Sequence, residues 1–119
     1  MKKILLIEDH LEILDNLKEY LEISGHNILV ARNGEEGLIL ALTHRPDLIV
    51  CDVIMPGIDG YEVLRQLKQK VETSDIPFIF SSSLSEKVDK FQAMALGAND
   101  YLVKPFDPQT LLDVIEKMA

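Results

Sequence analysis

The sequence has 119 residues, 47% of them hydrophobic, and a formal net charge of -8. This length suits one compact domain over residues 1–119 and excludes two domains with separate cores. The excess of carboxylates disfavours direct binding to nucleic acid or to an anionic membrane surface. The single cysteine, Cys51, excludes an intramolecular disulfide and lies in an apolar run, which predicts a buried thiol in a reducing compartment.

Five short apolar runs are spread along the chain, each too short for a helix and rich in branched or aromatic residues, which predicts strands. They are Ile4 to Ile7, Ile28 to Ala31, Leu48 to Val53, Phe78 to Phe80 and Tyr101 to Val103. The first run is ended by Glu8 and Asp9, well before it reaches the length of a signal peptide core or a membrane span. We therefore expect a cytoplasmic protein.

A stretch with helical spacing follows each run, which predicts five helices. Their apolar positions are Leu14, Leu17 and Leu21; Leu38, Ala41 and Leu42; Val63, Leu64 and Leu67; Val88, Phe91 and Ala95; and Leu111, Leu112, Ile115 and Met118. Gly25 and Gly97 are placed to end helices, while Asn33 and Asp107 are placed to begin them. Strands that are apolar on both faces and alternate with helices predict a doubly wound α/β domain with a parallel sheet.

Polar side chains that can do chemistry lie at the carboxyl end of four of the five predicted strands or directly after it. They are Glu8 and Asp9, then Asp52, then Ser81, Ser82 and Ser83, and then Lys104. Parallel strands bring these positions to one edge of the sheet, where α/β domains bind ligands. Three carboxylates crowded there repel one another unless a cation joins them, and oxygen ligands favour Mg²⁺. A lysine and a hydroxyl complete a clamp for a phosphoryl group, with an aspartate carboxylate as its acceptor.

These residues resemble the receiver domains of response regulators in two-component signalling. The resemblance spans essentially all 119 residues and rests on the acidic pair, on Asp52-Val53-Ile54-Met55-Pro56-Gly57, on Asp59-Gly60, on a hydroxyl after the fourth strand, and on Lys104-Pro105-Phe106. It implies a flavodoxin-like sheet of five parallel strands in the order 2-1-3-4-5 with five helices. It also implies a phosphoacceptor signalling domain in a phosphorelay, which catalyses only its own phosphorylation and dephosphorylation and is otherwise not an enzyme.

The resemblance also assigns the residues of a magnesium site. Asp52 would be the phosphorylated residue and a metal ligand, and Asp9 a second direct ligand. The backbone carbonyl of Ile54 would be a third ligand. Glu8 would act largely through water, and it stands where many members of the family have aspartate.

The remaining roles concern the phosphoryl group and the response to it. Lys104 would contact the phosphate, and a cis bond is expected before Pro105. The family's usual spacing selects Ser82 as the switch hydroxyl, although Ser81 beside it occupies a position that is usually apolar. Tyr101 would be the rotating aromatic. The expected partners are a sensor histidine kinase or a phosphotransfer protein, and a homodimer or output domain would use the face of the fourth helix, fifth strand and fifth helix.

Simpler interpretations stay open for each of these residues. Asp52 could be a buried acid bonded to a loop, Lys104 a solvated loop lysine, and Tyr101 an aromatic packed in its strand. Ser82 could cap the fourth helix, although Ser85 is the better cap candidate. For the whole chain, a flavin carrier would need a phosphate-binding loop where the acidic pair stands. A docking module that accepts no phosphate is the other alternative.

Overall fold

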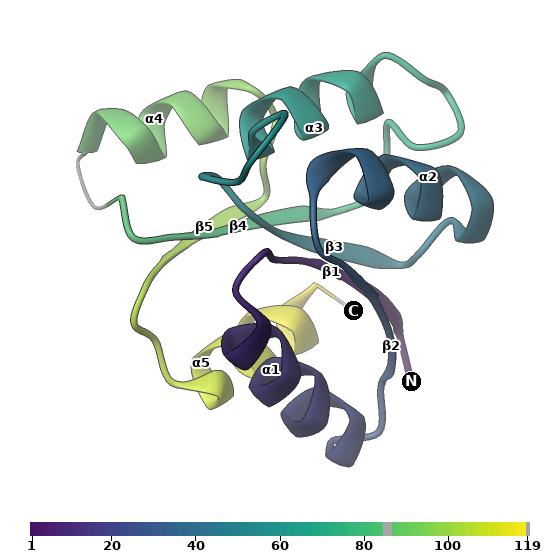
Figure 1. Cartoon of the computed structure of the whole chain (residues 1–119), viewed down its shortest axis with the longest axis vertical. Helices are drawn as coiled ribbons and strands as arrows, with labels where there is room; N and C mark the ends of the chain where they lie inside the picture. The colour runs from purple at the N-terminus through teal and green to yellow at the C-terminus, as the bar shows by residue number, and fades with distance from the viewer. Residues whose placement is uncertain (85–86, 119) are drawn as a thin grey trace.

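The computed structural model describes residues 1–84 and 87–118, and within them strands and helices alternate along the chain (Figure 1). The strands are β1 (Lys3–Ile7), β2 (Asn27–Ala31), β3 (Leu48–Asp52), β4 (Phe78–Ser82) and β5 (Asp100–Val103). The helices are α1 (Leu11–Ile23), α2 (Gly34–His44), α3 (Gly60–Lys68), α4 (Lys87–Ala95) and α5 (Pro108–Lys117). The predicted alternation is confirmed.

Three strands begin one residue earlier than the sequence predicts, and the carboxyl ends of the two other strands differ as well. Backbone pairing explains the two carboxyl ends. The third strand stops at Asp52 because the carbonyl of Val53 leaves the sheet and accepts a hydrogen bond from the Gly60 N–H at 2.8 Å. The fourth strand continues past Phe80 through Ser82, because its backbone still pairs with β5 there. A ladder of backbone hydrogen bonds does not depend on whether the side chains are apolar.

The five strands form one parallel sheet in the order β2-β1-β3-β4-β5. Helices α2, α3 and α4 cover one face, and α1 and α5 cover the other (Figure 1). This is the doubly wound, flavodoxin-like architecture that was predicted. The order of the strands reverses between β1 and β3, because the chain runs outward to β2 on one side and to β3 on the other. Such a switch point opens a crevice at the carboxyl ends of the strands.

The core has two halves, one on each side of the sheet. Leu5 and Ile7 of β1 pack with the first half, beneath α2 to α4, whereas Ile4 and Leu6 pack with the second, over α1 and α5. Successive side chains of a strand point to opposite faces, so a sheet covered on both sides needs apolar residues at every position. Cys51 is fully buried in the first half, and this burial raises the pKa of its thiol well above the usual value.

The predicted helix ends are confirmed by their local geometry. The Asn33 side chain accepts a hydrogen bond from the backbone N–H of Glu36 at 2.8 Å, and Asp107 caps α5 in the same manner. Gly25 and Gly97 follow α1 and α4 with φ of +99° and +102°. Glycine adopts this left-handed conformation without the strain that a side chain would bring.

The helices are all short. The longest in the described ranges is α1, with 13 residues. About 20 apolar residues are needed to cross the hydrocarbon core of a bilayer. Within residues 1–84 and 87–118, none of the helices is long and apolar enough to do so.

Candidate functional site

Four strands deliver polar side chains to one edge of the sheet. Glu8 and Asp9 come directly after β1, Asp52 is the last residue of β3, Ser82 is the last residue of β4, and Lys104 follows β5. The strand register aligns these ends, since Ile7 pairs with Cys51, Asp52 with Ser81, and Ser82 with Val103. The edge predicted from the sequence is therefore present.

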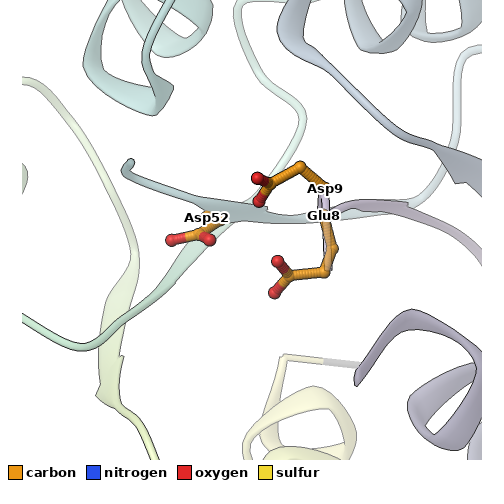
Figure 2. A group of neighbouring side chains, drawn as sticks. All are labelled: Glu8, Asp9 and Asp52. Carbon is orange, nitrogen blue, oxygen red and sulfur yellow. The ribbon is translucent and has the colours of Figure 1, made fainter. Parts of the chain in front are cut away.

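Three carboxylates gather around one space at this edge (Figure 2). One oxygen each from Glu8, Asp9 and Asp52 lies within 4.8 Å of the other two, and Glu8 and Asp52 are buried while Asp9 is half-buried. Like charges at this separation raise one another's free energy unless a cation offsets them. An all-oxygen donor set with this charge fits a hard cation such as Mg²⁺.

The three carboxylates differ in the hydrogen bonds and ion pairs that they form. Both oxygens of Glu8 accept hydrogen bonds, Oε1 from Lys104 Nζ and Oε2 from the backbone N–H of His10 at 3.1 Å. Asp52 accepts from Lys104 Nζ and from the backbone N–H of Ile54. Within the described part of the chain, no hydrogen bond or ion pair engages the Asp9 side chain. Asp9 is therefore the carboxylate with the most free lone pairs.

Lys104 is held at the centre of the site by two ion pairs. Its Nζ lies 2.5 Å from Glu8 Oε1 and 3.2 Å from Asp52 Oδ2, with only 15% of its side chain exposed. Burial lowers the pKa of the ammonium, but the hydrogen bonds and charges of Glu8 and Asp52 outweigh burial and raise it. Burial has the opposite effect on a carboxylate and raises the pKa of Glu8, although the hydrogen bond from Lys104 acts to lower it. Lys104 is thus a charged site residue and not a solvated loop lysine, and the peptide bond before Pro105 is cis.

Ser82 and Tyr101 are both buried and are linked through Leu84. The Ser82 hydroxyl accepts a hydrogen bond from the Leu84 N–H at 3.1 Å, and the Tyr101 hydroxyl donates to the Leu84 carbonyl at 2.8 Å. Burial raises the pKa of the Tyr101 phenol, although a hydrogen bond with the Ser82 side chain lowers it. No pattern in the sequence indicates that the backbone of Leu84 joins these two side chains.

The structure separates some of the alternatives that the sequence left open. Ser82 bonds to the loop before α4, which begins five residues later at Lys87, while the alternative cap Ser85 lies outside the described residues. Asp52 does bond to a loop, through Ile54, but it also faces the acidic cluster and Lys104. Tyr101 packs in its strand against Phe80, with ring centroids 6.1 Å apart.

Gly60, which belongs to the Asp59-Gly60 motif, has a packing role that the sequence did not reveal. A Cβ atom at this position would lie 2.2 Å from the Asp52 carbonyl oxygen and 2.9 Å from the Val53 Cα. The Asp59 side chain caps α3 by accepting from the Glu62 N–H at 2.9 Å, which directs the helix against the end of β3. The Asp59-Gly60 pair therefore lets α3 begin in contact with the backbone that carries Asp52. The available sequence signal was a glycine directly after an N-cap aspartate.

A doubly wound sheet whose switch-point edge carries an acidic cluster and a lysine defines a class of protein, the α/β domains that handle phosphoryl groups with a divalent cation. The family model of the response regulator receiver domain matches residues 4–116. The chain belongs to this family. It is a phosphoacceptor signalling domain of two-component systems. Members of the family are generally not classical enzymes, and they interact with histidine kinases or phosphotransfer proteins.

Individual relatives have similar lengths or are longer. The chain is 40% identical to Protein PilH of Pseudomonas aeruginosa, over 97% of this chain and 95% of that protein. It is 43% identical to the alkaline phosphatase synthesis transcriptional regulatory protein PhoP of Bacillus subtilis, over 91% of this chain but 44% of that protein. The chain thus spans nearly all of one relative and less than half of the other.

Solved structures share the fold closely. The chemotaxis protein CheY4 of Vibrio cholerae superposes with a TM-score of 0.94 at 29% identity, covering 100% of this chain and 99% of that one. A putative response regulator from Chloroflexus aurantiacus gives a TM-score of 0.93 at 32% identity, covering 98% and 96%. The fold of this chain therefore has its counterpart, over nearly its whole length, in solved structures of response regulators.

Proposed function

We propose that Asp52 is the residue that receives the phosphoryl group. The observation that carries this proposal is its position, because its buried carboxylate faces both Lys104 and the carboxylates of Glu8 and Asp9. In the transfer, an Asp52 oxygen forms a bond to phosphorus while the bond between phosphorus and the donor nitrogen of a phosphohistidine breaks, and that nitrogen keeps the electron pair and is protonated as needed. Lys104 neutralises charge on the phosphoryl oxygens.

The same residues would hold a magnesium ion. We assign Asp9, Asp52 and the backbone carbonyl of Ile54 as direct ligands, with Glu8 acting largely through water. The free lone pairs of Asp9 support its assignment, and the engagement of both Glu8 oxygens supports an indirect role for Glu8. When bound, Mg²⁺ supplies positive charge that stabilises the transferring phosphoryl group.

The chain would catalyse its own phosphorylation and dephosphorylation and no other reaction. Its donor would be a sensor histidine kinase or a phosphotransfer protein in the cytoplasm, where a free, buried thiol such as Cys51 persists in reduced form. A flavin-carrying function is disfavoured, because the loop after β1 presents the carboxylates of Glu8 and Asp9 where a phosphate would have to bind.

Incubation with phosphoramidate and Mg²⁺ is expected to add one phosphoryl group to the wild-type chain, and a chelator is expected to prevent it. Without the cation, nothing offsets the charge of three clustered carboxylates as an anionic donor approaches. Intact-mass spectrometry measures the product, and restoring Mg²⁺ in excess of the chelator is the control. Unmodified protein under all conditions would favour the alternative of a docking module that accepts no phosphate.

Phosphorylation would be transmitted through Ser82 and Tyr101 to the face formed by α4, β5 and α5. A phosphoryl group adds about two negative charges, which attract the Ser82 hydroxyl away from the Leu84 N–H. Tyr101 already lies inside the domain in this structure, because Phe80 packs against its ring and Leu84 accepts its hydrogen bond. Phosphorylation would therefore stabilise the inward conformation of Tyr101 and not create it.

The exposed residues of this face support its assignment as the surface for a homodimer or an output domain. Lys87, Lys90 and Phe91 are exposed on α4, whereas Phe106, which follows β5, is half-buried against the core beneath α1 and α5. Val88 and Met94 of α4 are also exposed, as is Val103 of β5. Adjacent exposed apolar side chains of this kind mark protein interaction surfaces.

The Ser82→Ala variant is expected to be phosphorylated at Asp52 but to lose most of its phosphate-dependent self-association or partner binding. Alanine keeps the volume of the buried site, but it removes the hydroxyl that couples the phosphoryl group to Leu84. Sedimentation with and without a beryllofluoride mimic measures the response, and Ser83→Ala, at an exposed neighbouring hydroxyl, is the matched control. If Ser82→Ala responds to the mimic as fully as wild type, Ser82 is only structural.

A further inference from the structure

We propose that Glu8 is a positioning residue that holds the Lys104 ammonium against Asp52, a role separate from any contribution to the metal site. It rests on the function proposed above, in which Asp52 receives the phosphoryl group and Lys104 contacts it. Its structural basis is the buried Glu8–Lys104 ion pair, whose ammonium also contacts the Asp52 carboxylate.

Glu8 is held in a single arrangement by the chain itself. One carboxylate oxygen binds Lys104, the other accepts from the His10 N–H, and the Glu8 backbone N–H donates to the Ala31 carbonyl at 3.0 Å. Only 4% of the Glu8 side chain is exposed, so water cannot readily replace these partners. Charge-assisted hydrogen bonds in such surroundings are the strong ones, and breaking one leaves a buried charge without its partner.

The contact requires two long side chains. Glu8 follows β1 and Lys104 follows β5, and the strands β3 and β4 lie between them. Neighbouring strands are about 4.8 Å apart, so the two backbones are separated by roughly 14 Å across the sheet. Aspartate at position 8 would be shorter by one carbon–carbon bond of about 1.5 Å, so its carboxylate would lie farther from Lys104 and hold the ammonium less closely.

The ion pair orients Lys104 for its work at Asp52. An ammonium group has three N–H donors, of which Glu8 takes one and Asp52 takes another. The third remains for an oxygen of the phosphoryl group. A lysine side chain that is already immobilised loses little further entropy when it binds this oxygen, so Glu8 prepares the site before the donor arrives.

The experiment measures how fast acetic anhydride acylates each lysine, with peptide mass spectrometry, in the presence of chelator and without a phosphodonor. In the wild type, Lys104 should react at least about tenfold more slowly than the exposed Lys70. A hydrogen bond to a charged group is strong enough to slow the reaction of the amine by this factor. Glu8→Asp should remove most of this protection. Asp52→Asn should leave most of it in place, because Glu8 still holds the ammonium.

Glu62→Asp is the matched control, since it shortens the carboxylate of another ion pair, the one with Arg65 on α3, without touching Lys104. Unchanged protection in Glu8→Asp would overturn the proposal, and so would loss of protection in Asp52→Asn equal to that in Glu8→Asp. If circular dichroism shows that Glu8→Asp is unfolded, the protection of Lys104 in Asp52→Asn alone tests the proposal, and loss of that protection overturns it. Failure of the wild type to accept a phosphoryl group would overturn the proposed function but leave this pattern of protection intact.

Discussion

The Asp52→Asn variant is expected to take up no phosphoryl group under conditions in which the wild-type chain is fully modified. The amide is nearly the same size as the carboxylate, but it is not a nucleophile toward phosphorus, so the loss should be complete and not gradual. Asparagine also removes one of the three carboxylates that gather at the edge of the sheet, and Mg²⁺ affinity should fall with it. Intact-mass spectrometry after incubation with phosphoramidate and Mg²⁺ measures the first effect, and calorimetric titration with Mg²⁺ measures the second.

The matched control is Asp15→Asn, which makes the same chemical change at an exposed position of α1. It should be phosphorylated to the same extent as the wild type. A phosphoryl group that still appears on Asp52→Asn, and that peptide mapping places on another residue, would end the assignment of Asp52. Because the substitution leaves the size of the side chain almost unchanged, a folded variant without phosphorylation identifies a chemical loss and not a structural one.

The Gly60→Ala variant is expected to lose about 3 kcal/mol of unfolding free energy, a cost typical of forcing atoms into packed space. Alanine normally favours a helix by up to about 1 kcal/mol relative to glycine, so helix propensity alone predicts that Gly60→Ala raises the unfolding free energy. The new Cβ would meet the Asp52 carbonyl oxygen at 2.2 Å, and backbone atoms cannot turn aside as a side chain can. For a domain of this size the midpoint of thermal unfolding should fall by roughly 12 °C.

Gly37→Ala is the control for this substitution. There the three atoms nearest to the new Cβ all belong to the Ile7 side chain, which can shift more readily than the backbone, so the loss of unfolding free energy should be clearly smaller. Urea titrations followed by circular dichroism compare the two variants with the wild type. Equal stability of Gly60→Ala and wild type would show that the start of α3 can move away from β3.

The sequence was sufficient to predict which segments form strands and helices and which edge of the sheet carries the site. Apolar runs such as Leu48 to Val53 and the helical spacing of Leu14, Leu17 and Leu21 are local patterns. The spacing of apolar residues follows directly from which faces of a strand or helix are buried. The site edge followed from connectivity, because Asp9 follows one strand and Asp52 ends another that runs in the same direction.

Only the tertiary structure decided how the side chains of that edge are paired. Glu8 and Lys104 are 96 residues apart in the chain, and no local pattern indicates that their charges meet at 2.5 Å. The inward position of Tyr101 likewise depends on the carbonyl of Leu84, a backbone group that is chemically the same in every residue. Local patterns report which surfaces are buried, whereas contacts between distant groups depend on strand order, register and side-chain length together. The chain therefore determined its fold class and the edge that carries its site by itself, while the pairing of charges within that site is a property of the folded sheet.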